Sequence, residues 1–183
     1  MQLQTGKPAP SVETRDVFDQ TITIGGTSQH WTLISFLRNG ACAMCNLRIH
    51  MMIAQYPALK NLGLEMIAIF ESPVSSIRAN VTKQNVPFAL LSDPEAKLYE
   101  LYGVETSQEK VALTMQMPET QVAIQQAANL GYALIPEEGS NFYRIPADFL
   151  IDPNGNLRIA HYANHLTDHL SFEQIRQTIL ERQ

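Results

Sequence analysis

The two cysteines of the chain, Cys42 and Cys45, lie between an apolar run and a segment without glycine or proline. Residues 31–36 predict a buried strand, and residues 46–55 are compatible with a helix. A strand that passes through a loop into a helix places the first cysteine at the helix N-terminus, where unpaired N–H groups and the helix dipole stabilise a thiolate. A second thiol one turn later can attack a mixed disulfide on the first. The spacing therefore indicates redox chemistry.

Three other interpretations of the pair stay open. It can be half of a zinc site, although the sequence has no second CxxC, so that His, Asp or Glu would have to complete the ligands. It can also be two buried core thiols or a purely structural disulfide. The strand–loop–helix context favours the redox interpretation over these.

Composition excludes several classes of protein. The chain has 183 residues, enough for one domain with a full core, and a net charge of −5 without a basic run, which argues against nucleic acid and anionic membranes as partners. No apolar run approaches the roughly 20 residues that span a bilayer. The first residues lack the basic and apolar regions of a signal peptide, so we expect a cytoplasmic protein. In that compartment a lone cysteine pair is more often catalytic or metal-binding than structural.

Strands and helices alternate along most of the chain. After a polar lead-in over residues 1–15, strands are predicted at residues 21–24, 31–37, 64–70, 88–91, 148–151 and 156–161, the last two forming an antiparallel hairpin. Helices are predicted from the cysteines to about Tyr56 and Pro57, from Ser72 as an N-cap, over residues 93–102, and from Ser171 as an N-cap. This pattern predicts an α/β fold with a mixed central sheet and helices on both faces, the layout of a thioredoxin-type fold.

Residues 104–143 interrupt the alternation. Residues 120–129 look helical and residues 131–140 irregular. A connection of this length inside a compact domain is usually functional or inserted. We therefore expect one domain over residues 1–183 with an insertion at 104–143, which either covers the active-site face or forms a subunit contact, as in a homodimer.

Three segments carry a family resemblance through their shared order along the chain. They are Gly6-Lys7-Pro8-Ala9-Pro10, then residues 91–94 followed by 101–104, and then Phe149 to Gly155. Together they resemble the alkyl hydroperoxide reductase and thiol-specific antioxidant family, the peroxiredoxin-like branch of the thioredoxin fold, over residues 6–180 without the insertion. The resemblance implies a thiol-dependent antioxidant oxidoreductase without an organic cofactor or a metal. It also implies a disulfide or hydroperoxide substrate and a thioredoxin- or glutathione-type thiol as reductant.

Two patterns within this resemblance differ over which cysteine attacks. Counting from Phe36, a peroxiredoxin places Pro two residues on, Thr six and the peroxidatic Cys nine, and here these positions hold Arg38, Cys42 and Cys45. The peroxiredoxin pattern therefore implies that Cys45 attacks a peroxide and Cys42 resolves the sulfenic acid. A thioredoxin-like exchange mechanism instead makes Cys42 the nucleophile. Both routes end in the same Cys42–Cys45 disulfide.

Pro146 favours the exchange mechanism. It replaces the peroxiredoxin arginine expected three residues before Phe149, and it resembles the cis-proline that faces the CxxC motif of thioredoxin-like oxidoreductases. We therefore expect a cis peptide bond at Pro146. Arg144 or Arg38 can still supply a cation, and Arg38 is either a thiolate stabiliser or a surface charge. Asp148 either accepts a proton from the buried thiol or is a solvated carboxylate.

Histidine and methionine residues suggest an alternative. His161, His165 and His169 are four residues apart, but they follow a strand and precede the Ser171 cap, so we expect a loop with solvated or locally bonded histidines rather than a metal-binding helix. Residues 44, 51 and 52 are methionines and would suit Cu(I) together with the cysteines, although methionine is a routine core filler. The alternative function is thus a non-catalytic copper-binding or redox-sensing module.

Overall fold

The computed structural model describes residues 1–133 and 135–181. The strands are β1 (Val12–Arg15), β2 (Thr21–Ile24), β3 (Trp31–Leu37), β4 (Leu64–Phe70), β5 (Ala89–Ser92), β6 (Ala147–Ile151) and β7 (Leu157–Tyr162). The helices are α1 (Ala43–Lys60), α2 (Val74–Asn80), α3 (Lys97–Leu101), α4 (Gln108–Gln116), α5 (Pro118–Asn129) and α6 (Phe172–Leu180), with a short 3₁₀ turn at Thr82–Gln84. Within this described part, no helix is long and apolar enough to cross a bilayer.

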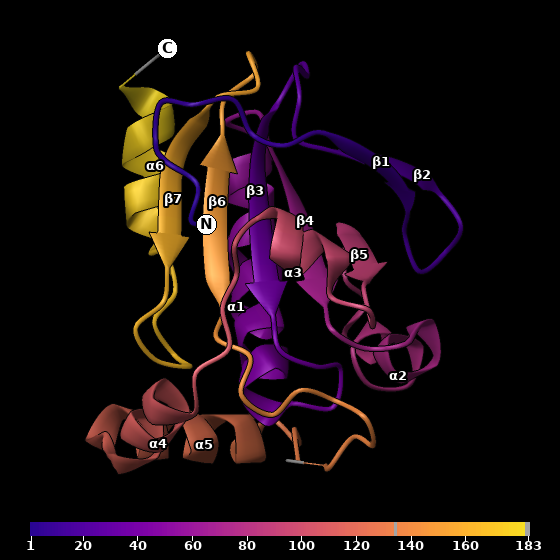
Figure 1. Ribbon diagram of the computed structural model, residues 1–183, viewed down its shortest axis with the longest axis vertical. Helices are drawn as coiled ribbons and strands as arrows, with labels where there is room; N and C mark the ends of the chain where they lie inside the picture. The colour runs from indigo at the N-terminus through magenta and orange to yellow at the C-terminus, as the bar shows by residue number, and fades with distance from the viewer. Residues whose placement is uncertain (134, 182–183) are drawn as a thin grey trace.

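The central sheet has the strand order β5-β4-β3-β6-β7, and β1 and β2 form a separate hairpin. The strands β3, β4 and β5 run parallel, whereas β6 is antiparallel to both β3 and β7. In Figure 1, α1 lies behind the sheet and α3 in front of it. This mixed sheet with helices on both faces is the thioredoxin-like fold that the sequence predicts.

The core consists of two apolar layers, one on each face of the sheet. On one face, side chains of α1, α2 and α6 pack against alternate residues of the strands, with Met52 and Ile175 fully buried. On the other face, Tyr99 and Tyr102 pack around Phe36 and Phe149, with ring centroids 5.0 to 5.7 Å apart. Because β3 is buried on both faces, its sequence lacks the alternation of a half-exposed strand.

Local signals misplace several helix boundaries. The prediction that Pro57 kinks or ends the first helix is wrong about its end, because α1 continues to Lys60. A proline there removes one intrahelical hydrogen bond, but the fully buried Leu59 anchors the last turn in the core. The prediction of Ser72 as an N-cap is also wrong, since α2 begins after Pro73 without a side-chain cap. In contrast, Ser171 caps α6 as expected by accepting from the Gln174 N–H at 3.2 Å.

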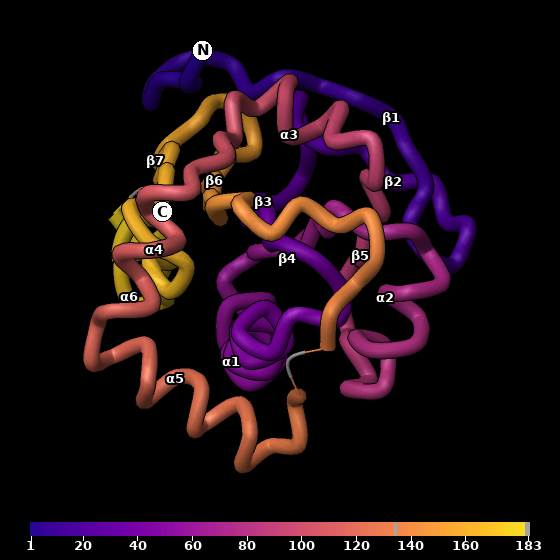
Figure 2. The backbone as a smooth tube through the Cα atoms, turned by 60° about the horizontal axis from the view of Figure 1, so that its bottom comes forward, coloured from indigo at the N-terminus to yellow at the C-terminus, as the bar shows by residue number. Residues whose placement is uncertain are grey.

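The segment 104–143 lies at the end of α1 where that helix begins. Figure 2 shows α4 and α5 passing around this end of α1. The fully buried Ala127 of α5 packs with Ala43 and Leu47 of α1. The predicted helix over 120–129 is confirmed within α5, and residues 131–140 are irregular as expected, except that Leu134 lies outside the described residues.

The aromatic layer makes a direct prediction about stability. Replacing the fully buried Phe149 by alanine, which opens a cavity among Phe36, Tyr102 and Tyr162, should lower the free energy of unfolding by about 3–5 kcal/mol. The control Phe18→Ala, at a position that is 54% exposed, should change it by less than about 0.5 kcal/mol. Urea denaturation measures both, and an equal effect of the two changes would contradict this packing.

Candidate active site

The junction between β3 and α1 places Cys42 at the N-cap of α1. Its backbone is extended, with φ −71° and ψ 120°, and its sulfur accepts the N–H of Cys45 at 3.3 Å. Polar side chains hold the loop before it: Ser72 Oγ accepts the N–H of Gly40 at 2.9 Å, and Asn46 Nδ2 donates to Gly40 O at 2.8 Å. The sulfur is therefore fixed at the helix N-terminus, as the sequence predicts.

Arg38 completes the surroundings of the two sulfurs. Its Nη2 donates to Cys42 Sγ at 3.2 Å, and its backbone N–H donates to Cys45 Sγ at 3.4 Å. The side chain is only 4% exposed, with its guanidinium 4.9 Å from the centroid of the Phe142 ring and Nη1 donating to Phe142 O at 3.2 Å. The Arg38 guanidinium therefore lies buried against Cys42 Sγ and is not a charge on the surface.

The surroundings shift the pKa values of the two thiols in opposite directions. A hydrogen bond from the Cys45 thiol and the charge of Arg38 lower the pKa of Cys42 to about 6, although burial acts in the opposite direction. Burial raises the pKa of Cys45 well above that of a free thiol, and the hydrogen bond and charge of Cys42 raise it further. These opposite shifts favour Cys42 as the thiolate near neutral pH, whereas the peroxiredoxin pattern implies attack by Cys45.

A small cavity adjoins both sulfurs, and we call it the cysteine cavity. Its walls include Arg38, Cys42, Met44, Cys45, Pro146 and His169. Pro146 therefore lies beside the cysteines as expected. The expected cis bond is wrong, because none of the described residues has a cis peptide bond.

Arg144 contacts groups other than the cysteines. Its Nε donates to Glu71 Oε2 at 2.5 Å, its Nη1 donates to Val104 O at 2.7 Å, and its guanidinium lies over the Tyr99 ring. These contacts hold the guanidinium on Glu71, so that Arg38 alone of the two arginines contacts a cysteine sulfur.

A polar cluster of Ser35, Arg48, Asp148 and His169 adjoins the cysteine cavity through His169. The Asp148 carboxylate is fully buried and accepts hydrogen bonds from Ser35 Oγ at 2.6 Å and from the Leu170 N–H at 2.8 Å. Arg48 Nη2 lies 3.6 Å and His169 Nδ1 lies 3.2 Å from its Oδ2. Burial alone would raise the pKa of Asp148, but Arg48 and the hydrogen bonds hold it well below the usual range. Asp148 is therefore a paired carboxylate, not a solvated one.

From the sequence we did not identify Arg48 as a partner of Asp148, nor the contact of His169 with the same carboxylate. The expected loop after β7 is confirmed for His165 and His169, while His161 lies within β7. His165 bonds locally, to Thr167 Oγ1, whereas His169 contacts Asp148 on β6 and is therefore neither solvated nor locally bonded. Two features of the sequence could have indicated the cluster. Arg48 lies in the second turn of α1, the helix that carries Cys45, and Asp148 lies on β6, the strand beside β3.

The methionines divide between core and surface. Met52 is fully buried among apolar side chains, Met51 is 46% exposed, and Met44 borders the cysteine cavity. In the described residues, no group of three or more His, Cys, Asp or Glu side chains is placed to hold a metal ion.

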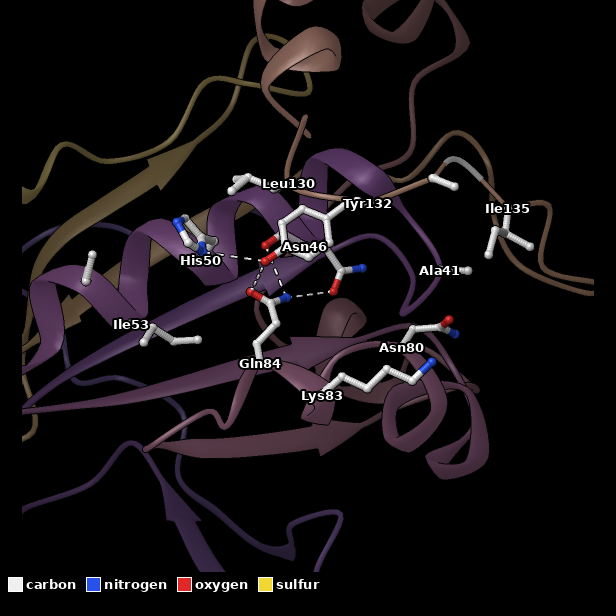
Figure 3. A pocket seen from close by; sticks show the side chains of 13 residues that line it. Ala41, Asn46, His50, Ile53, Asn80, Lys83, Gln84, Leu130, Tyr132 and Ile135 are labelled. Atoms are coloured by element: carbon white, nitrogen blue, oxygen red, sulfur yellow. Dashed lines mark hydrogen bonds between the residues drawn. The ribbon is translucent and has the colours of Figure 1, made fainter. Parts of the chain in front are cut away.

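A second pocket, of about 570 Å³, lies on another side of α1 and includes Ala41 in its lining (Figure 3). Gln84 Nε2 donates to Asn46 Oδ1 at 2.9 Å, and Tyr132 Oη donates to Gln84 Oε1 at 2.7 Å. Asn46 also donates to Gly40 O and Cys42 O, at 2.8 and 3.1 Å. This chain of hydrogen bonds ties the segment after α5 to the loop that carries Cys42.

The contact between Arg38 and Cys42 predicts how the thiol titrates. In Arg38→Gln the pKa of Cys42 should rise from about 6 toward the ~8.5 of a free thiol, because the positive charge beside the thiolate is lost. Its alkylation rate at pH 7 should fall about tenfold as the thiolate fraction drops. Iodoacetamide labelling of Cys42 against pH measures both. Arg176→Gln, on α6, is the matched control, and an unchanged pKa in Arg38→Gln would contradict the assignment.

The sequence matches the AhpC/TSA family over residues 5–160. No curated protein sequence matches the chain.

Solved structures with a similar fold come from peroxiredoxin-like and thioredoxin-like proteins. A peroxiredoxin-like protein from Aquifex aeolicus has a TM-score of 0.65 at 13% identity, over 99% of this chain and 88% of its own. A candidate thiol:disulfide interchange protein DsbE from Chlorobium tepidum has a TM-score of 0.63 at 17% identity, over 98% of each chain. The reduced 2-Cys peroxiredoxin of Plasmodium vivax has a TM-score of 0.63 at 16% identity, over 96% of this chain and 79% of its own. With a thioredoxin-like fold and a family match over most of its length, the chain belongs to the AhpC/TSA family.

Proposed function

We propose that the protein is a thiol-dependent oxidoreductase that cycles Cys42 and Cys45 between dithiol and disulfide, with Cys42 as the attacking thiol. The observation that carries this proposal is the Arg38 guanidinium 3.2 Å from Cys42 Sγ at the N-terminus of α1. A buried cation and a helix N-terminus both favour the thiolate, which is the nucleophile in thiol chemistry. The family and the fold support a redox role of this kind.

With a hydroperoxide as substrate, the Cys42 thiolate attacks the outer oxygen of the peroxide bond. The O–O bond breaks, Cys42 becomes a sulfenic acid, and the other oxygen leaves as an alcohol or water after taking up a proton. The Cys45 sulfur then attacks Cys42, a disulfide forms, and the sulfenic oxygen leaves as water. Two electrons have passed from the thiols to the peroxide, and an external thiol of the thioredoxin or glutathione type returns them.

With a disulfide as substrate, the same groups act in the same order. Cys42 attacks one sulfur and releases the other as a thiol, and Cys45 then displaces the second half of the substrate to leave the Cys42–Cys45 disulfide. We thus place Cys42 first in both routes.

A buried donor favours the hydroperoxide. Arg38 borders the cysteine cavity, and its buried Nε has no hydrogen-bond partner among the described residues. Such a donor can stabilise the negative charge that develops on the leaving oxygen. Of the two substrate classes, we therefore place the hydroperoxide first.

The covering of the site favours a small substrate. The Cys42 side chain is 2% exposed, beneath the contact of Arg38 with Phe142 and beside α5. A folded protein cannot bring a disulfide to a sulfur covered in this way without displacing the cover. We retain residues 104–143 as an insertion whose role is to cover the active-site face, and we infer that it restricts the substrate to small molecules.

The alternative of a soft-metal site is less favoured. Met44 borders the cavity together with both cysteines, as a Cu(I) site requires. Arg38, however, places a positive charge against the sulfur that would bind the cation, and the two charges repel. The metal content of the purified protein, measured beside its free-thiol count, distinguishes the two functions.

The dithiol cycle predicts a defined product. After mild treatment with hydrogen peroxide, mass spectrometry should show a loss of two hydrogens and a peptide crosslink between Cys42 and Cys45, both reversed by dithiothreitol. Cys45→Ser should stop at an added oxygen on Cys42, because no resolving thiol remains. Cys42→Ser should react at least about tenfold more slowly, since the pKa of Cys45 is raised. Free thiols that persist in the treated protein would contradict the cycle.

The Phe142 ring over Arg38 predicts that small reagents reach Cys42 more easily than large ones. In Phe142→Ala a bulky maleimide should label Cys42 several-fold faster, whereas the small iodoacetamide should gain less, because the ring over Arg38 limits access more than reactivity. Phe18→Ala, which removes an exposed ring elsewhere, serves as the control. Equal gains for both reagents would show that the ring does not exclude large molecules.

A further inference from the structure

The cluster of Ser35, Arg48, Asp148 and His169 lies against the cysteine cavity but has no part in the cycle described so far. Only His169 belongs both to the cluster, through the 3.2 Å contact of its Nδ1 with Asp148, and to the lining of the cavity beside Cys42 and Cys45. Its side chain is 13% exposed. A histidine that contacts a buried carboxylate and lines the same cavity as a reactive thiol has the arrangement of a general base.

We propose that His169 takes the proton from the Cys45 thiol when Cys45 attacks the oxidised Cys42. This inference rests on the proposed function and deepens it, because it assigns the acid–base chemistry of the second step. The transfer runs across the cysteine cavity, directly or through one water molecule.

Cys45 needs such a base. The residue is 7% exposed, and burial raises the pKa of its thiol, which favours the protonated form near neutral pH. Loss of the negative charge on Cys42 after oxidation removes one obstacle to ionisation but leaves the burial unchanged. A thiol that must attack from this state reacts quickly only if a nearby group accepts its proton.

Asp148 is unsuited to be that base. Its two oxygens already accept from Ser35, Leu170 and His169 beside Arg48, and its pKa lies well below the usual range. The carboxylate instead sets the state of His169. Because an ionised carboxylate only accepts, Nδ1 of a neutral His169 carries the hydrogen, and Nε2 is left as the proton acceptor. No hydrogen bond among the described residues engages Nε2.

The charges around His169 keep it neutral but able to take up a proton. Burial and the charge of Arg48 from α1 lower its pKa, His161 on β7 lowers it further, and Asp148 on β6 acts in the opposite direction. Asp168, in the same loop, is paired with His161, at 3.0 Å. Across the cavity stand the cysteines and the Arg38 guanidinium, which contacts Cys42.

The proton balance closes within the site. Cys45 transfers its proton to Nε2 and attacks the Cys42 sulfur, and the S–S bond forms as the S–O bond of the sulfenic acid breaks. The departing hydroxide takes the proton back from His169 and leaves as water. With a mixed disulfide, the departing thiolate takes the same proton and leaves as a thiol. Asp148 stabilises the imidazolium in between.

Methyl methanethiosulfonate separates the attack by Cys42 from the attack by Cys45 in the intact chain. Attack by Cys42 on the methylthio sulfur breaks the S–S bond of the reagent, attaches a methylthio group to Cys42 and releases methanesulfinate. Attack by Cys45 on Cys42 then releases methanethiol and forms the disulfide. Quenched-flow mass spectrometry follows each species against pH. In His169→Gln, the rate of attack by Cys42 should stay within about twofold of the rate in the parent protein. The rate of attack by Cys45 should fall about 100-fold at pH 7.

The pH profile distinguishes a proton acceptor from a structural residue. In the parent protein the rate of the second step should be level above the ordinary histidine pKa of about 6.5 and fall at lower pH as His169 becomes protonated, because burial and Arg48 lower the pKa of His169. In His169→Gln it should rise about tenfold per pH unit, since the thiolate fraction of Cys45 then sets the rate. His165→Gln, four residues away in the same loop, should behave as the unmodified protein.

Three results would overturn the proposal: an unchanged second step in His169→Gln, an equal slowing of both steps, or a slowed second step that keeps the level profile. If His169→Gln does not fold, the unmodified protein decides, because a second step that rises steadily from about pH 5 to about pH 9 excludes a histidine base. Failure of the proposed function looks different, since Cys42 then does not react or no disulfide forms even in the unmodified protein. Asp148 is not varied because its loss leaves Arg48 buried without a counter-charge.

Discussion

A thiolate that is almost completely buried requires a positive charge in contact with it, and here Arg38 lies 3.2 Å from Cys42 Sγ. Without that charge, burial would favour the neutral thiol and remove the nucleophile. The cation is itself only 4% exposed, so its own burial has to be offset by the sulfurs and by the Phe142 ring and carbonyl. The strand end, the helix start and the covering segment all meet at this contact. Its geometry therefore depends on the complete fold and not on the motif alone.

The two cysteines differ because one helical turn separates their surroundings. Cys42 lies at the N-cap, where it accepts from the Cys45 N–H and from Arg38. Cys45 lies inside the first turn, where burial dominates and the charge on Cys42 opposes a second ionisation. The proposed division into an attacking and a resolving thiol rests on this difference. In this proposal the resolving thiol of Cys45 requires a group that accepts its proton, because burial raises its pKa.

The sheet supplies the groups around the pair. Asp148 lies directly opposite Ser35 in the register of β6 and β3, and Arg48 reaches it from α1. A buried ion pair contributes little net stability on average, but removing one partner leaves a costly unpaired charge. The cluster therefore fixes the position of α1 relative to the sheet, and with it the position of the cysteines. On the other side, Asn46, Gln84 and Tyr132 tie the loop before Cys42 to the segment that follows α5.

The sequence by itself determined the strands β3 and β4, the terminal hairpin and the cysteine pair at a helix start, because these depend on apolar runs, turn residues and spacing along the chain. It did not determine the helix end beyond Pro57 or the role of Ser72, where packing and long-range hydrogen bonds override local preference. The cis bond expected at Pro146 came from the resemblance alone, and the trans bond found there follows the ordinary preference of such bonds. Arg38 could be named but not assigned, since a charged residue beside a motif is as often on the surface. Only the tertiary structure decided that this guanidinium turns inward onto Cys42 and that His169, 124 positions after Cys45, lines the same cavity. Contacts between residues so far apart depend on how the strands pair and the helices pack, which no short stretch of sequence encodes.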